Sequence, residues 1–186
     1  DGVDVSHDPG TVGYGSPMSP GYYRQGLNHN VPLVGGEGEK PWQPGVLLRF
    51  DAVAAIMSAA QPEYRPGASA RRTLSINGDT LIDEAVVKRT AAATSDAPPP
   101  KLGLALHLQG KPRLSSAFHE VSTDAFAAGR PAAFGYWKDV RAARFRDKAE
   151  VEVEFAGGRV LVLTFATSGA FTLYHGLSPD APPASR

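Results

Sequence analysis

The chain has 186 residues, and 19 lysines and arginines balance 19 aspartates and glutamates, so that the formal net charge is zero. This length fits one domain with a sizeable core, and the neutral charge argues against binding nucleic acid or anionic membranes by bulk attraction. The absence of cysteine excludes disulfides, thiolate metal sites and cysteine nucleophiles. No apolar run approaches the roughly 20 residues of a membrane-spanning helix. We therefore expect neither nucleic acid nor membrane as a partner.

The first 45 residues are rich in glycine, proline, asparagine and tyrosine, and their turn signals predict a loop-rich segment. Within it, the short apolar run 31–34 predicts a strand. The alanine-rich run 52–60 has helical propensity, but it is short and Pro62 follows closely. The family resemblance described below favours a strand there.

Two hairpins are predicted from apolar and polar residues that alternate around tight turns. Residues 72–76 and 80–87 flank an Asn77-Gly78 turn, which is the strongest short-range hairpin signal. Residues 149–155 alternate strictly and lead through a glycine turn into the apolar run 160–165.

Three further elements complete the expected pattern. Residues 102–108 predict one strand with Leu106 and Leu108 buried and His107 on the opposite face. Residues 171–175 predict another strand, and residues 123–128 at most one turn of helix. Eight or more short strands between turns indicate an all-β fold, a two-sheet antiparallel β-sandwich of roughly eight to twelve strands with little helix.

His29 is the most informative histidine. It lies between Asn28 and Asn30 and closely follows Tyr23 and Arg24, so that phenol, guanidinium, amide and imidazole groups gather in one short stretch. Core packing does not require this mixture, and loop residues placed by a rigid sheet often bind ligands. Because asparagine and histidine are also common in turns, a site and an ordinary turn both remain open interpretations on spacing alone.

His107 has two interpretations as well. A histidine in the middle of a strand is either held there by hydrogen bonds or serves as a metal ligand. None of the five histidines stands in a self-sufficient metal-binding spacing such as HExxH.

The order of these residues resembles the heparinase II/III-like polysaccharide lyases. The run HDPGT at residues 7–11 with Tyr14, followed by HNVPLVGG at residues 29–36, is similar to two segments of that family's C-terminal β-domain. Tyr64 and the LALHLQG run at residues 104–110 also resemble family positions. The resemblance covers most of residues 5–110.

The resemblance implies a function. Lyases of this family combine an N-terminal α/α toroid with a two-sheet β-domain and cleave uronic-acid polysaccharides by β-elimination. This reaction needs a base for the C5 proton, an acid for the departing oxygen and a group that neutralises the uronate carboxylate. Because the toroid carries most of these groups, we expect the isolated chain to be inactive.

Carried onto this sequence, the resemblance implies that His29 is catalytic, with its role as acid, base or charge-neutralising group left open. It also implies that Tyr23, Arg24, Asn28 and Asn30 bind substrate. His107 matches a histidine that can contribute to a zinc site in the family. The family's metal-binding aspartate has no counterpart shortly before Tyr64, so zinc is only a candidate cofactor.

The expected organisation is one β-sandwich domain over residues 1–186, the C-terminal portion of a larger lyase. Segment 1–45 would carry the site and residues 177–186 would form a frayed tail. The expected partners are a uronic-acid polysaccharide or oligosaccharide and an upstream toroid domain or companion chain. The resemblance favours a periplasmic or secreted location, and a cytoplasmic one is the alternative.

The alternative function is a non-catalytic carbohydrate-binding or interaction β-sandwich. In that case exposed aromatic side chains would stack on sugar rings. The candidates are Tyr22, Tyr23, Trp42, Tyr136 and Trp137.

Overall fold

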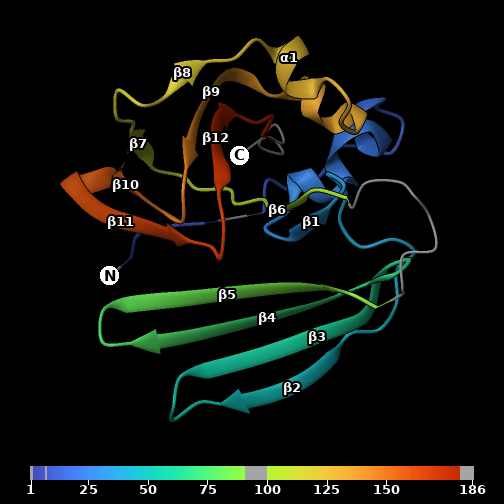
Figure 1. Ribbon diagram of the computed structural model, residues 1–186, viewed down its shortest axis with the longest axis vertical. Helices are drawn as coiled ribbons and strands as arrows, with labels where there is room; N and C mark the ends of the chain where they lie inside the picture. Colours follow the sequence, from blue (N-terminus) through green and yellow to red (C-terminus); the bar gives the residue numbers. More distant parts are fainter. Residues whose placement is uncertain (1, 7, 91–99, 181–186) are drawn as a thin grey trace. The chain divides into compact units, whose positions relative to one another are not determined.

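The computed structural model describes residues 2–6, 8–90 and 100–180 (Figure 1). Its elements are almost all antiparallel strands, which confirms the all-β class with little helix. No helix in these ranges is long and apolar enough to cross a membrane. The sequence predicted one domain over 1–186, whereas contacts divide the chain into two compact units. The first runs to His29 and resumes at Leu106, and the second is Asn30–Ala105.

The first unit contains two three-stranded antiparallel sheets. One has the order β11-β10-β7, formed by β7 (Lys111–Arg113), β10 (Lys148–Phe155) and β11 (Arg159–Ala166). The other has the order β12-β9-β8, formed by β8 (His119–Glu120), β9 (Lys138–Phe145) and β12 (Phe171–Leu177). The predicted hairpin is confirmed, with Val151 paired opposite Leu163.

The core of this unit draws on both sheets. Strict alternation in β10 turns its glutamates to solvent and buries Val151, Val153 and Phe155. These side chains cluster with Ala143 of β9 and with Phe118. A β-sandwich is the arrangement that hides one apolar face of each sheet, so this cluster accounts for the stacking of the two sheets.

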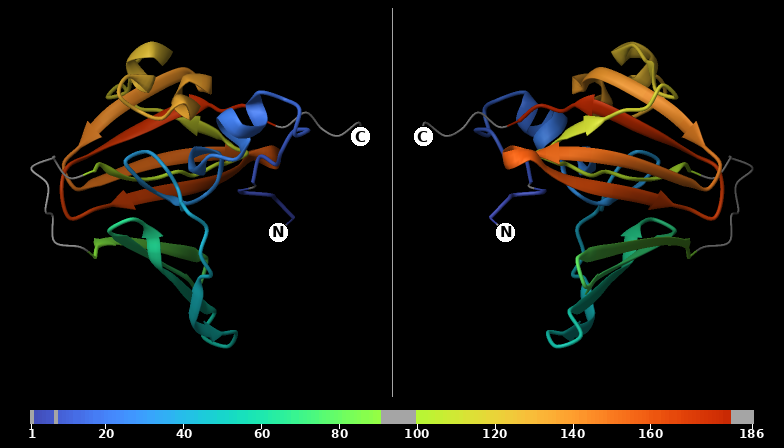
Figure 2. Two further views of the ribbon diagram at one scale, coloured as in Figure 1. Left: turned by 90° about the vertical axis from the view of Figure 1, so that its right-hand side faces the viewer. Right: turned by 90° about the vertical axis from the view of Figure 1, so that its left-hand side faces the viewer.

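A short helix, α1 (Thr123–Ala127), packs on the other side of the β12-β9-β8 sheet (Figure 2). Ser122 caps it by accepting a hydrogen bond from the backbone N–H of Ala125. Phe126 of the helix lies against Trp137 and Tyr174, with ring centroids 5.6 and 5.1 Å apart. The single helical turn predicted at 123–128 is confirmed.

The loop-rich start of the chain is confirmed too. Before the second unit, its described residues form two helical turns, Ser19–Tyr23 and Gly26–Asn28. Its side chains nevertheless enter the core, because Tyr22 is fully buried and its hydroxyl accepts a hydrogen bond from Nε1 of Trp137 at 3.2 Å. Packing of this kind holds the segment together with a single backbone bridge between Ser6 and Leu108.

The predicted frayed tail is ordered in its described part. Leu177 ends β12, Ser178 bonds to His107, and the carbonyl of Asp180 accepts a hydrogen bond from Tyr23 at 2.8 Å. The rest of the predicted tail, 181–186, lies outside the described residues.

The second unit is a four-stranded meander with a smaller two-stranded sheet. The meander has the order β2-β3-β4-β5, formed by β2 (Val46–Asp51), β3 (Ile56–Arg65), β4 (Ala68–Asn77) and β5 (Thr80–Arg89). The smaller sheet pairs β1 (Pro32–Val34) with β6 (Leu102–Leu104). The Asn77-Gly78 hairpin is confirmed, and Gly78 adopts the positive φ of 61° that such a turn favours.

Two predicted strands need correction. Residues 52–55 form a turn instead of a strand, because the carboxylate of Asp51 accepts a hydrogen bond from the N–H of Ala54, and β3 begins only at Ile56. The predicted strand 102–108 ends at Leu104, which pairs with Pro32 at the start of β1. Leu106 and Leu108 are half-buried, while His107 between them is the buried residue.

The buried core of the second unit occupies one end of the meander. Val34 and Tyr64 pack there on the small side chains Ala68 and Ala70. The hydroxyl of Tyr64 donates a hydrogen bond of 2.6 Å to the carbonyl of Pro32, which ties β3 to β1. Burial, and to a smaller extent the charge of Glu39, raises the pKa of Tyr64 to about 12.

We expect Val153→Ala to lower the free energy of unfolding by about 2 kcal/mol, because it leaves a cavity at a side chain only 1% exposed. Val162→Ala is the matched control, since Val162 lies on the neighbouring strand and is 56% exposed. Its cost should stay within about 0.5 kcal/mol. If urea unfolding shows that both variants lose the same free energy of unfolding, the assignment of Val153 to the buried face and Val162 to the exposed face would be wrong.

We expect Tyr64→Phe to cost about 1–3 kcal/mol near neutral pH, because the carbonyl of Pro32 loses its donor. A folded pKa of about 12, raised above an unfolded value of about 10, adds stability below pH 10 that is lost between pH 10 and about 12. Over that pH interval, the free energy of unfolding of the wild type should therefore fall more steeply than that of the variant. Tyr14→Phe, at a residue 91% exposed, is the control and should behave as wild type.

Candidate functional site

Asp8 and His29 form a hydrogen-bonded pair in the first unit. Nδ1 of His29 lies 2.6 Å from Oδ2 of Asp8. The same carboxylate accepts a hydrogen bond of 3.0 Å from the backbone N–H of Gly10. Burial raises the pKa of Asp8, but the hydrogen bonds from His29 and Gly10 outweigh it, so that the pKa falls below its ordinary value. Asp8 is therefore ionised at neutral pH and serves as an acceptor.

This geometry assigns the protons of the pair. A carboxylate can only accept, so Nδ1 of His29 carries the proton, and in the neutral ring Nε2 keeps its lone pair. Nε2 has no hydrogen-bond partner among the residues that the structure describes. The His29 side chain is 36% exposed, so an external group can reach it. The pair can therefore take a proton from a ligand at Nε2 or, once protonated, give one.

Buried polar groups hold the backbone that carries His29. Asn28 is completely buried, and its amide lies 3.4 Å from the carbonyl of Gly10 and 3.3 Å from that of Tyr23. These bonds connect the loop of Asp8 to the segment of His29. The carbonyl of Leu27 accepts a hydrogen bond of 2.8 Å from Nε2 of His107. His29 is thus presented from a fixed backbone although no strand carries it.

The predicted substrate-binding residues have different surroundings. Tyr23 is 3% exposed, its hydroxyl donates to Asp180, and burial raises its pKa. Because Tyr23 and Asn28 are both buried, the structure gives them a structural role in place of the predicted contact with substrate. Arg24 is exposed, and its side chain has no hydrogen bond or ion pair with the described residues, although its backbone N–H donates to the carbonyl of Ser19. Asn30 begins the second unit, where its carbonyl accepts a hydrogen bond from Arg72.

The predicted metal role of His107 does not agree with its environment. Its side chain is buried, Nε2 donates to Leu27, and Nδ1 lies 3.3 Å from the hydroxyl of Ser178. Both ring nitrogens are therefore engaged with protein groups, and neither offers a lone pair to a cation. Within the described ranges, no group of three His, Asp or Glu side chains could hold a metal ion.

Asp8 belongs to the motif at residues 7–11, but the sequence does not predict its contact with His29. The local signal was present, because an Asp-Pro-Gly turn in which the aspartate bonds to the backbone two residues later fixes the carboxylate. What the sequence could not supply was the approach of two residues 21 positions apart. His7 of the same motif lies outside the described residues.

Most of the aromatic side chains that could stack on sugar rings are buried in this structure. Tyr22, Tyr23 and Trp137 are at most 8% exposed and belong to the core of the first unit. Trp42 is 77% exposed but belongs to the second unit. Three of the five candidates are therefore unavailable for stacking on sugar rings.

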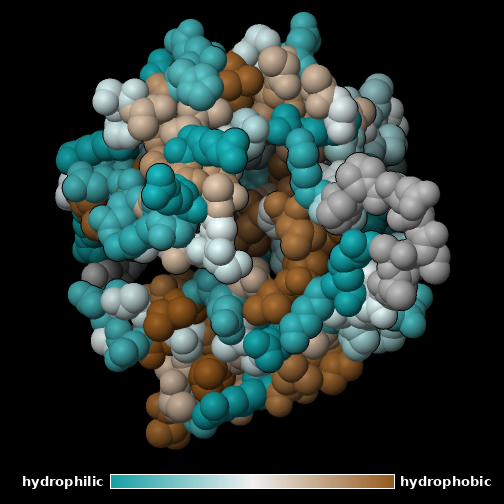
Figure 3. All heavy atoms as spheres, viewed as in Figure 1, coloured by the Kyte–Doolittle hydropathy of each residue, from teal (hydrophilic) through white to brown (hydrophobic). Residues whose placement is uncertain are grey.

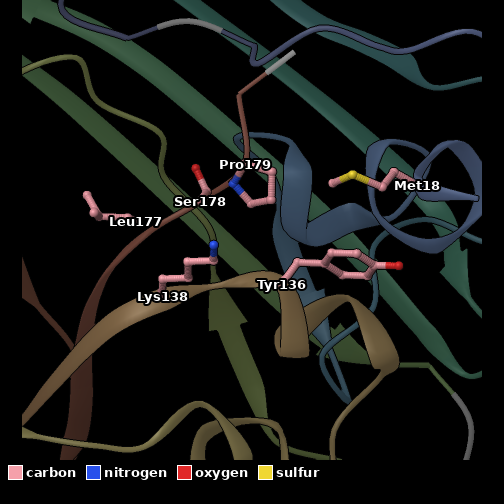
Figure 4. Close-up of a pocket in the computed structure, with 6 residues that line it drawn as sticks. All are labelled: Met18, Tyr136, Lys138, Leu177, Ser178 and Pro179. Carbon is pink, nitrogen blue, oxygen red and sulfur yellow. The ribbon is translucent and has the colours of Figure 1, made fainter. Parts of the chain in front are cut away.

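A shallow pocket of about 420 Å³ opens in the first unit (Figure 4). Its wall is mostly apolar, and its one charged group is the ammonium of Lys138. The lining residues are Met18, Tyr136, Lys138, Leu177, Ser178 and Pro179. His29 and Asp8 are not among them, so the pocket does not enclose the imidazole.

Comparisons of this chain with protein families, with curated proteins and with solved structures found no match.

We expect His107→Phe to lower the free energy of unfolding by about 2 kcal/mol, because the buried carbonyl of Leu27 loses its donor. The replacement keeps a ring beside Trp137, so the loss reports mainly on hydrogen bonding. Added zinc should leave the Tm of wild type and variant unchanged. A zinc-dependent rise in Tm that disappears in the variant would restore the metal role.

Proposed function

We propose that this chain is the β-domain of a polysaccharide lyase that cleaves uronic-acid-containing glycans by β-elimination, and that His29 is the catalytic group it supplies. The Asp8–His29 pair is the observation that carries this proposal, because it presents an oriented and accessible imidazole. The family resemblance of residues 7–11 and 29–36 supports it. The toroid domain that completes the active site, and a periplasmic or secreted location, are parts of the same proposal.

The elimination needs one proton removed and one supplied. The C5–H bond and the C4–O4 bond of the uronate break, and a C4=C5 double bond forms. The C5 proton passes to a base, and the departing O4 takes a proton from an acid. Nε2 of His29 suits either task, since it accepts a proton in the neutral ring and donates one in the protonated ring.

Asp8 makes the imidazole a better catalyst in two ways. Its carboxylate fixes the tautomer and the plane of the ring, so that Nε2 is the free nitrogen. It also stabilises the imidazolium that forms when Nε2 takes up a proton, as an ionised carboxylate does for a catalytic histidine. Asp8 is thus a positioning residue that acts through His29.

Arg24 is the side chain of the predicted set that fits the uronate carboxylate. Its guanidinium is exposed and makes no hydrogen bond or ion pair with the described part of the chain. A guanidinium binds a carboxylate through two parallel hydrogen bonds, which favours arginine wherever carboxylates are recognised. We assign Arg24 to substrate binding on this ground.

The test is turnover of a uronic-acid polysaccharide by the enzyme assembled from this chain and its toroid domain, followed by the ultraviolet absorbance of the new double bond. We expect His29→Ala to lower kcat by about 10³-fold and Asp8→Asn by about 10²-fold, with the fold intact. His119→Ala is the matched control, because His119 is an exposed histidine on β8, and it should retain activity. Normal turnover of His29→Ala would refute the proposal.

A further inference from the structure

The meander of the second unit exposes an unusual amount of apolar side chain. Hydrophobic residues lie at the surface over its strands in Figure 3. The pairing register places six of them on one side of the sheet: Phe50, Met57 and Leu74 lie in one cross-strand row, Leu47 lies beside it, and Ile76 faces Leu81. We call these six side chains the apolar face. Five of them are 43–69% exposed, and Leu74 is half-buried.

A bulge in β2 contributes to this face. The register shifts between Leu47 and Arg49, so that Leu47 pairs with Ala59 and Phe50 with Met57. Leu47 and Phe50 therefore point to the same side although they are three residues apart. The bulge and the charged Arg49 and Asp51 also obstruct pairing of another strand along the β2 edge. These features favour a partner that packs on the apolar face over one that adds a strand to the β2 edge.

The opposite side of the sheet is polar at its centre. Ser58 and Thr73 share a hydrogen bond of 2.9 Å there, flanked by the ion pair of Arg49 and Asp51 at 3.1 Å. This side also carries Val46 and Ile82, which are 48% and 49% exposed, but it has fewer large apolar side chains than the apolar face. An antiparallel sheet normally packs its more apolar side against another layer. The covered part of the apolar side lies at the other end, around Ala68 and Ala70.

Area and charge indicate what fits the apolar face. Each half-exposed large side chain contributes roughly 100 Å² of accessible surface, so the face offers about 500 Å². This area is within the range of the largest apolar patches on monomeric proteins. Two copies would bury about 1,000 Å² in total, which is the lower limit for a specific interface. Its nearest charges, Arg72 and Asp83, pair with each other at 2.8 Å. Two identical faces can therefore approach without repulsion between like charges.

We propose that the apolar face binds the same face of a second copy of this chain, so that the two meanders stack as the layers of a sandwich. Twofold symmetry makes such an interface self-complementary, and twisted sheets pack in this way with their strands roughly aligned, about 10 Å apart. Met57 and Leu74, on the two inner strands, lie at the centre of the contact, and Phe50 and Leu81 lie on the outer strands β2 and β5. The interface is independent of His29 and goes beyond the lyase proposal.

Sedimentation velocity of the full chain over a range of concentrations tests this interface. Wild type should dimerise reversibly, and Phe50→Glu or Leu81→Glu should raise the Kd about tenfold or more, because each places two like charges in the contact. Val162→Glu is the control, at a residue 56% exposed in the first unit, and should dimerise as wild type does. Circular dichroism and Tm establish that each variant is folded.

Cross-linking supplies a second readout, because the chain has no cysteine and each introduced thiol is unique. Met57→Cys should be joined to its copy by a short bis-maleimide, whereas Val162→Cys should not. A wild type that remains monomeric at all concentrations overturns the proposal. A dimer that Phe50→Glu and Leu81→Glu leave intact overturns it too. Neither result depends on lyase activity.

Discussion

The buried imidazole of His107 is the interaction on which the candidate site depends. It donates to the carbonyl of Leu27 and lies within hydrogen-bond distance of Ser178, so it joins the segment before His29 to the end of β12. That segment has almost no backbone pairing of its own. In a strand, the ladder would fix the position of His29, whereas here buried side chains perform this task. The buried amide of Asn28 adds bonds to Gly10 and Tyr23.

The two units bury their sheets to different extents. In the first, each sheet covers the apolar side of the other, so strict alternation in β10 leads to a closed core. In the second, the small residues Ala68 and Ala70 admit Val34 and Tyr64 at one end of the meander only. The large residues at the other end, Phe50 among them, stay exposed. An incompletely covered sheet indicates an interaction surface.

Local patterns in the sequence are sufficient to predict the two hairpins. The Asn77-Gly78 turn and the alternation of residues 149–155 each specify a register, because a turn type and a period of two determine which side chains face inward. The run 52–60 was less predictable, since the Asp51 side chain stabilises a turn that propensity does not reveal. The strand predicted at 102–108 ends at Leu104, because its partner β1 begins at Pro32, opposite Leu104.

The candidate site was predictable only in part. The sequence identified His29 by its mixture of polar neighbours, but it could not reveal that Tyr23 and Asn28 are buried while Arg24 is exposed. Burial of a polar side chain depends on partners distant in the chain, such as the carbonyl of Asp180 for Tyr23. The pairing of Asp8 with His29 is a tertiary contact of the same kind.

The most direct measurement of the central claim is ¹⁵N NMR of the histidine rings while a uronic-acid oligosaccharide is added. The proposed geometry predicts that Nδ1 of His29 carries the proton in the free protein and that its Nε2 signal moves on titration. The ring of buried His107 should not respond. A His29 ring protonated at Nε2 alone, or an Nε2 signal indifferent to the uronate, would contradict the assignment of His29 as the catalytic group.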